Sequence, residues 1–243
     1  MNPDQDASRR ERIVVINPNS TQAVTDGIDR AMEPLRLAGG PEIHCRTLAE
    51  GPPGIESQRH VDGVVGPLCA MIEREDNAAD AFVIACFSDP GLHSARECTA
   101  RPVIGISEAA MTTALTLGER FGIIAILPTS VDRHCRYIRQ MGLQQRFAAD
   151  LPLGVGVTGL GGGQEIEDRM AAVGQELVAS HGADVVIMGC AGMAQYREPL
   201  QRRLGVPVVD PSQAAVSLAI GAVRLGFRTA AQARRSNGRG NGH

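Results

Sequence analysis

Two of the six cysteines, Cys86 and Cys190, each follow a short apolar run of the kind that forms a buried β-strand. Pro102 lies 16 residues after Cys86, and Pro207 lies 17 residues after Cys190, so the two cysteines have nearly the same surroundings in the sequence. Two thiols that face one carbon atom from opposite sides can act as a base and an acid, one removing a proton and the other returning one. This pair therefore predicts inversion of configuration at a carbon acid.

An internal repeat indicates that the two cysteines occupy equivalent places. Residues 101–110 align with residues 206–215, with Pro, Val, Ser, Ala and Ala in register. Further upstream, each half begins with a strand that ends in a proline-containing, hydroxyl-rich turn, at 16–21 and 126–130. Such a repeat indicates two related structural units and favours a functional role for the matched pair. Packing or surface placement is expected for the cysteines without a repeat partner, Cys45, Cys69, Cys98 and Cys135.

Strand-like and helix-like stretches alternate along the chain. The strand-like runs are 13–16, 43–48, 82–85, 103–106, 122–127, 185–188 and 206–209. The amphipathic stretches of helical length are 20–37, 59–78, 108–119, 130–142, 164–181 and 212–225. This alternation predicts an α/β fold with two pseudosymmetric halves, each a mostly parallel sheet flanked by helices, and an active site in the cleft between them.

The expected boundaries follow from the repeat and from composition. The first half is expected over residues 12–112, completed by a C-terminal helix at 212–227, and the second half over residues 113–211. The polar termini, residues 1–11 and 228–243, are expected to be disordered.

A cysteine needs assistance to act as a base, because a free thiol has a pKa of about 8.5 and is mostly protonated at neutral pH. Both cysteines directly precede sequences that resemble helix starts, at 88–92 and 191–194, so helix N-termini are expected to favour the thiolate. Removing a proton beside a carbonyl group creates an enolate, whose oxygen requires hydrogen-bond donors. Candidate donors are Ser20, Ser88, Thr129 and the amides of residues 17–20 and 191–192.

Composition and charge exclude several functional classes. A net charge of -3, 3% aromatic residues and no Trp provide neither a basic field nor a stacking surface for nucleic acid. No apolar run reaches the roughly 20 residues of a membrane span, and the charged first 12 residues do not fit a signal peptide. The cysteine and histidine spacings match no zinc motif, so no metal is expected. We therefore expect a cytoplasmic protein whose partner is a small-molecule substrate, not nucleic acid or a membrane.

Two further motifs suggest other functions. Residues 154–159 match the GxGxxG pattern, but more glycine follows where a dinucleotide site requires a helix, so a flexible segment beside the cleft is favoured. Ser107 lies in a near match to the nucleophile elbow of serine hydrolases. Because Ser212 has the same place in the repeat, helix N-caps are the simpler interpretation of both serines. A binder without catalysis is the remaining alternative of a different class.

Three charged features have structural interpretations that need no role in catalysis. Asp89 is interpreted as a turn or helix-start residue, with orientation of a cleft group through His93 as the alternative. Glu108 is interpreted as a solvated carboxylate in the first turn of a helix. The arginine-rich stretch 133–146 has the alternating pattern of an exposed helix face.

Three motifs in this order and spacing strongly resemble the hydantoin and allantoin racemases of the Asp/Glu racemase superfamily. They are Ile-Asn-Pro-Asn-Ser-Thr at 16–21, Ala-Cys-Phe-Ser-Asp-Pro-Gly-Leu at 85–92 and Met-Gly-Cys-Ala-Gly-Met at 188–193. The resemblance covers about residues 12–227. It implies a cofactor-independent, homo-oligomeric enzyme that inverts a carbon acid with Cys86 and Cys190. It also implies that the substrate is cradled by Asn17, Pro18, Asn19, Ser20, Phe87, Ser88, Ala191 and Gly192.

Differences within the superfamily narrow the expected substrate. Aspartate and glutamate racemases carry Cys-Asn-Thr after the first cysteine, where this chain has Cys86, Phe87 and Ser88. Arylmalonate decarboxylases lack the first cysteine. We therefore expect a racemase of 5-substituted hydantoins or a related cyclic ureide such as allantoin, with a largely neutral cleft. An arylmalonate-type decarboxylase and an amino-acid racemase remain the alternatives.

Overall fold

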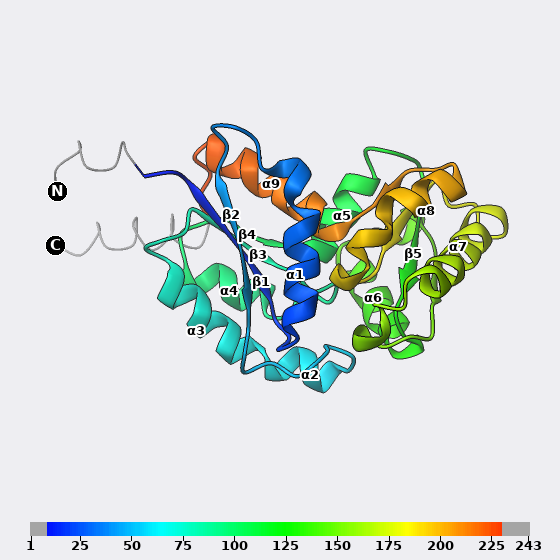
Figure 1. Ribbon diagram of the computed structural model, residues 1–243, viewed down its shortest axis with the longest axis horizontal. Coiled ribbons are helices and arrows are strands. Elements are labelled where there is room, and N and C mark those ends of the chain that lie inside the picture. The colour runs from blue at the N-terminus through cyan, green and yellow to red at the C-terminus, as the bar shows by residue number, and fades with distance from the viewer. Residues whose placement is uncertain (1–8, 230–243) are drawn as a thin grey trace.

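The computed structural model describes residues 9–229, which form two four-stranded parallel sheets with helices on both faces (Figure 1). The first sheet has the order β2-β1-β3-β4 and the second β6-β5-β7-β8, the same order in each half. The strands of the first are β1 (Arg12–Asn17), β2 (Glu42–Thr47), β3 (Ala81–Ile84) and β4 (Val103–Gly105). Those of the second are β5 (Phe121–Ala125), β6 (Phe147–Pro152), β7 (Val185–Met188) and β8 (Val208–Val209). The predicted fold of two α/β halves is confirmed.

The helices form layers around these sheets. In the first half they are α1 (Gln22–Ala31), α2 (Gln58–Gly63), α3 (Val65–Glu75), α4 (Leu92–Cys98) and α5 (Ile106–Ala114). The rest of the chain adds α6 (Pro128–Gln140), α7 (Gln164–Ala179), α8 (Arg197–Leu204) and α9 (Pro211–Arg224). Short 3₁₀ helices are η2 (Glu33–Leu35), η3 (Gln144–Arg146), η4 (Val157–Gly159) and η5 (Ala191–Tyr196).

Successive side chains along a strand point to opposite faces of the sheet. Because helices cover both faces, the side chains of the central strands are buried on both. In β1, Val14 packs with the cluster under α2, α3 and α4, whereas Val15 packs with α5 and α9. The latter cluster continues into the second half, where it includes Ile123 of β5 and Ile187 of β7. The halves therefore share one continuous core, with α5 in contact with strands of both sheets.

Some elements differ from the sequence prediction. The edge strand β6 was not predicted, because its residues Phe-Ala-Ala-Asp-Leu-Pro are half-exposed and lack a run of β-branched side chains. The helix start expected at 88–92 corresponds to the short helix α4, which begins at Leu92. The expected helix 59–78 is two helices separated at Val64, since Pro67 has no N–H to continue the hydrogen bonding of the preceding turn.

Residues near both chain ends make contacts with the first half where the structure describes them. Arg9 forms an ion pair of 2.8 Å with Asp80, and the Glu11 carbonyl accepts a hydrogen bond from the Glu42 amide, whereas disorder of the termini stays a prediction. The Thr229 amide donates to the Ala100 carbonyl. Residues 1–8 and 230–243 lie outside the described part. Helix α9 packs on β1, β3 and β4 of the first sheet. The division of the chain into a first half completed by residues 212–227 and a second half over 113–211 stays a prediction.

The helix starts in the repeat are capped by carboxylates, so the predicted serine caps are wrong. Ser107 and Ser212 are each the second residue of a helix. Helix α9 is capped by Asp210, whose Oδ1 accepts from the Gln213 amide at 2.7 Å. Helix α5 has Gly105 at the equivalent place and is capped by Asp89, which accepts from the amides of residues 107 and 108 at 2.9 Å. Asp89 thus ties the loop after Cys86 to α5.

We predict that Gly105→Ala destabilises the protein by about 1–3 kcal/mol. A Cβ atom at residue 105 would lie 2.3 Å from the Asp89 carboxylate, which is buried and held by two amides. The matched control is Gly221→Ala in α9, where a Cβ meets nothing within 4 Å and a gain of about 0.5–1 kcal/mol is expected. Denaturant unfolding measures both, and equal stability of Gly105→Ala and wild type would contradict the argument.

Candidate active site

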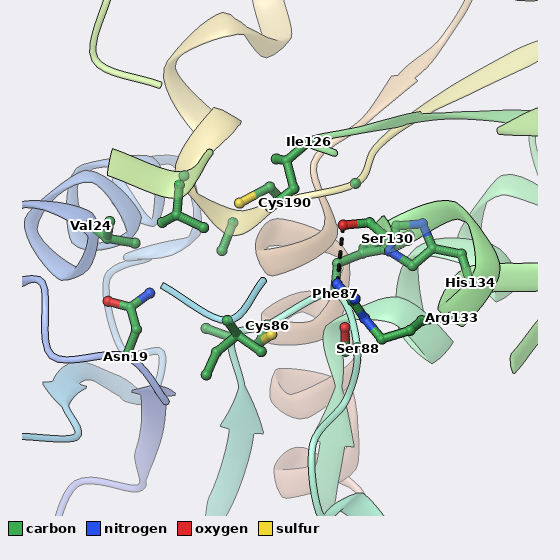
Figure 2. Close-up of a pocket in the computed structure, with 16 residues that line it drawn as sticks. Asn19, Val24, Cys86, Phe87, Ser88, Ile126, Ser130, Arg133, His134 and Cys190 are labelled. Atoms are coloured by element: carbon green, nitrogen blue, oxygen red, sulfur yellow. Dashed lines mark hydrogen bonds between the residues drawn. The ribbon is translucent and has the colours of Figure 1, made fainter. Parts of the chain in front are cut away.

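Cys86 and Cys190 line the same cavity between the two halves (Figure 2). Cys86 follows β3 and Cys190 follows β7, so the equivalent central strands of the two sheets deliver them. Figure 2 shows the two sulfur atoms on opposite sides of the cavity. Its free volume is about 30 Å³, which is enough for roughly two water molecules. The free space between the two thiols is therefore small.

The structure brings together seven of the eleven residues predicted for the site. Those that line the cavity are Asn19, Cys86, Phe87, Ser88, Cys190, Ala191 and Gly192. Four others are absent from the lining: Asn17, Pro18, Ser20 and Thr129. Asn17 orients a lining residue, because its Nδ2 donates a hydrogen bond to Asn19 Oδ1 at 3.0 Å. Thr129 is exposed and donates to the Glu56 carbonyl at 3.2 Å, so its predicted contact with substrate is not supported.

Helix α6 contributes three lining residues that the sequence analysis missed, Ser130, Arg133 and His134. Arg133 is 8% and His134 3% exposed, so the predicted exposed face of 133–146 is wrong for these two positions. His134 Nδ1 lies 2.7 Å from Asp150 Oδ2, and its ring packs edge-on against Phe87 at 5.0 Å between centroids. The repeat could have directed attention to the start of α6, but alternating charge does not distinguish a buried arginine from an exposed one.

One cation lies in the otherwise largely uncharged lining. Arg133 brings a guanidinium to the cavity, and the residues that line it include no Asp or Glu. Arg133 therefore places a local positive charge at one side of the cavity, suited to a ligand that carries or develops negative charge there.

Burial raises the pKa of both thiols, to about 12 for Cys86 and about 11 for Cys190. Hydrogen bonds from backbone amides oppose this shift, from Ser88 to the first sulfur and from Gly192 to the second. The helix-terminus prediction holds for Cys190, which is the N-cap of η5. It is wrong for Cys86, because α4 begins only at Leu92.

Nearby charges make the two thiols unequal. Asp89 raises the pKa of the Cys86 thiol and Arg133 lowers it, whereas Glu56 and Asp210 both raise the pKa of Cys190. The carboxyl group of Asp89 accepts two backbone amides, so the alternative in which it orients a group through His93 is not observed. Glu108 is half-buried and paired with Arg96 at 3.0 Å, so its predicted solvated role is also corrected.

Comparison with known proteins identifies the chain's family. The family profile described as Asp/Glu/Hydantoin racemase matches residues 13–219. The chain belongs to this family. It is 36% identical over 226 residues to a hydantoin racemase of Paenarthrobacter aurescens, covering 90% of this chain and 93% of the relative. An allantoin racemase from Klebsiella pneumoniae has a TM-score of 0.86 at 33% identity, with 90% of each chain covered.

The resemblance inferred from the three motifs is thus confirmed, and the protein is an isomerase of the racemase type. An arylmalonate decarboxylase structure has a TM-score of 0.64 at 19% identity, covering 87% of this chain and 92% of that one. At that identity the similarity shows a shared fold alone.

One segment of the racemase bridges the two halves at the edge of the cavity. Glu56 Oε1 accepts from the Val157 amide at 2.8 Å, and the Glu56 carbonyl accepts from Thr129 and Arg133 at 3.2 Å. Val157 belongs to the glycine-rich run 154–163, which lies beside the cavity as expected. The run follows β6 and enters the short η4, so it does not form the strand-turn-helix of a dinucleotide site.

A groove of about 550 Å³ adjoins the cavity and shares Val24, Val157 and Gly192 with it. Ala31 of α1 and Leu160 add apolar surface, and the only charged residue in its lining is Arg30. The small cavity and the larger, mostly apolar groove are therefore neighbours that share three residues of their walls.

Other functions find less support in the described residues. Ser107 is fully buried within α5, so its hydroxyl cannot reach a substrate as a hydrolase nucleophile. Across residues 9–229, no three His, Cys, Asp or Glu side chains gather as a metal site would require. Over the same residues, no helix combines the length and apolar character needed to cross a membrane.

We predict that Cys86 and Cys190 of the free racemase react with iodoacetamide at pH 8 more than about 100-fold slower than an ordinary thiol. The reason is that burial raises the pKa of both thiols to about 11 or 12, which leaves little thiolate at that pH. Peptide mass spectrometry follows each site, and the unfolded protein is the control, in which protection should vanish. Rapid alkylation of both folded sites would contradict the expected thiol state.

Proposed function

We propose that this racemase inverts 5-substituted hydantoins or a related cyclic ureide such as allantoin, without a cofactor, by proton transfer between Cys86 and Cys190. The observation that carries the proposal is the placement of two thiols on opposite sides of one small cavity. Similarity to a hydantoin racemase and an allantoin racemase supports the choice of substrate class.

In the proposed reaction, one cysteine reacts as the thiolate and the other as the thiol. The thiolate takes the proton from C5, and the electron pair of the C5–H bond moves into the ring to give an enolate. The opposite thiol then donates its proton to the other face of C5, which leaves that sulfur as the thiolate. Proton count and charge are conserved over the cycle, and the configuration is inverted.

Backbone amides in the cavity stabilise the negative charge that the proposed reaction places there. Burial disfavours the thiolate, as the raised pKa values of both cysteines express, but the amides of Ser88 and Gly192 already point at the sulfurs. A preorganised donor costs no reorganisation when charge develops, so these amides lower the barrier. Asn19, held by Asn17, supplies a polar side chain for an amide group of the ring.

The two alternative reactions place different requirements on the site. An arylmalonate-type decarboxylase needs one proton donor after loss of CO₂, and the second thiol would then have no role. An amino-acid racemase needs recognition of an α-carboxylate and an amino group. Both remain outcomes of the experiment below.

We predict that the purified protein racemises single enantiomers of hydantoins or of allantoin in D₂O and incorporates deuterium at C5, without added metal or cofactor. Cys86→Ser and Cys190→Ser should each lower racemisation by at least about 1,000-fold, because a serine hydroxyl is a far weaker acid and base partner than a thiol. Optical rotation and mass spectrometry measure the two events.

The matched control is Cys69→Ser, a cysteine of α3 outside the cavity, which should retain wild-type activity. Absence of exchange on every ureide would overturn the substrate assignment, and arylmalonates and free amino acids would then be assayed. Full activity of either active-site variant would overturn the two-thiol mechanism.

We also propose that the 5-substituent occupies the groove, since the cavity alone leaves only about 30 Å³. Gly27→Leu in α1 should narrow the groove and lower kcat/KM for a benzyl-substituted hydantoin by about 10-fold or more. Activity on 5-methylhydantoin should change little. Gly221→Leu, at an open position of α9, is the control, and an equal loss on both substrates would refute the placement.

A further inference from the structure

Arg133 is a buried cation without an anionic partner. Its side chain donates to three neutral oxygens: Nη1 to the carbonyls of Thr129 and Glu56 at 2.9 and 3.2 Å, and Nη2 to Ser130 Oγ at 3.1 Å. Its Nε is buried and has no hydrogen-bond partner. No carboxylate of residues 9–229 forms an ion pair with it, whereas Arg36, Arg96 and Arg203 all have such partners. Because burying an unpaired charge is costly, this arrangement points to an anion that the protein itself does not supply.

The guanidinium lies where such an anion would form. Arg133 lines the cavity that holds both thiols, and that lining contains no Asp or Glu. Figure 2 shows its side chain extending from α6 beside Ser130 toward the space between Cys86 and Cys190. Its charge acts on the Cys86 sulfur, where it lowers the pKa of the thiol.

The proposed reaction places a negative charge at one defined atom. When the C5–H bond breaks, the electron pair is delocalised onto the oxygen of the C4 carbonyl, and the proton goes to sulfur. When C5 is protonated again, that charge returns to the second sulfur. A cation with a fixed position stabilises the transition state if it interacts more strongly with the enolate oxygen than with the neutral carbonyl.

We propose that Arg133 is a further catalytic residue, which binds the C4 oxygen of the ureide and stabilises the enolate. This inference rests on the proposed function. Arg133 remains protonated throughout and exchanges no proton with the substrate. Its orientation is set before substrate arrives by the three neutral acceptors. Thr129 contributes to that orientation through its carbonyl and through its hydroxyl, which shares the Glu56 carbonyl as acceptor.

Arg133→Gln tests the charge while keeping a polar side chain. We expect kcat for hydantoin racemisation to fall about 100- to 1,000-fold, the usual effect of removing one donor to a developing oxyanion, with KM changed only a few-fold. Arg133→Lys should recover at least about ten-fold of the loss, since it restores a positive charge. Arg139→Gln, an exposed arginine of the same helix, is the matched control and should behave as wild type.

A second measurement distinguishes a charge effect from a structural one. The rate of Cys86 alkylation by iodoacetamide at pH 8–9 should fall in Arg133→Gln, because loss of the nearby cation raises the pKa of that thiol further. It should remain near the wild-type rate in Arg133→Lys. Thermal melting checks that each variant is folded. If Arg133→Gln does not fold, kcat and the alkylation rate of Cys86 are compared between Arg133→Lys and Arg133→Met, and higher values in Arg133→Lys are expected.

The outcomes separate this inference from the proposed function. Suppose that the wild-type protein exchanges the C5 hydrogen for deuterium and that Arg133→Gln has an unchanged kcat. This result would overturn the role of Arg133 and leave the proposed function intact. A rise in KM without a fall in kcat would also overturn it, since that would indicate ground-state binding only. A wild-type protein inactive on every ureide would overturn the proposed function, and the alkylation rates would still report whether Arg133 acts on Cys86.

Discussion

Two thiols can serve one carbon atom only if the sheets that carry them keep a fixed relation to each other. Three sets of contacts maintain that relation. Helix α5 lies against strands of both sheets, α1 packs on η5, and Glu56 joins the two halves at the edge of the cavity. The contacts of α5 belong to the buried apolar core that both halves share, so they resist separation of the halves. The Glu56 contacts are local and polar, and they connect the loop before α2 to α6 and to η4.

Duplication gave the two halves one sheet order, but it did not make the surroundings of the two thiols equal. In the second half Asp210 caps α9 from within its own helix start. In the first half the equivalent position is Gly105, and Asp89 fills the vacant space from the loop that carries Cys86. Fixing the loop in this way holds Asp89 at φ 41°, a conformation that few residues other than glycine adopt. The strain is compensated by two amide hydrogen bonds that attach the Cys86 loop to α5.

The sequence was sufficient to predict the features that depend on pattern. Buried parallel strands form continuous apolar runs, and the repeat located Cys86 and Cys190 at equivalent strand ends. Side-chain direction was not readable in the same way. Arg133 and Arg139 belong to one arginine-rich helix, yet one is buried in the site and the other is exposed, because only the contact with the rest of the protein determines which face of α6 turns inward. Thr129 was misplaced for the same reason: it lies one residue before Ser130, which does line the cavity.

The electrostatics of the cavity explain why a buried thiol pair can still be useful. Burial disfavours a thiolate and an enolate alike, so a site that simply excluded water would raise the barrier to proton transfer. The fixed cation of Arg133 opposes this penalty and favours a negative charge close to it, whether that charge resides on sulfur or on oxygen. In the proposed reaction, moving the charge from the first thiolate to the enolate and then to the second thiolate does not change the net charge of the cavity. Little reorganisation of the protein is then required at each step, and the reaction can proceed in either direction, as racemisation demands.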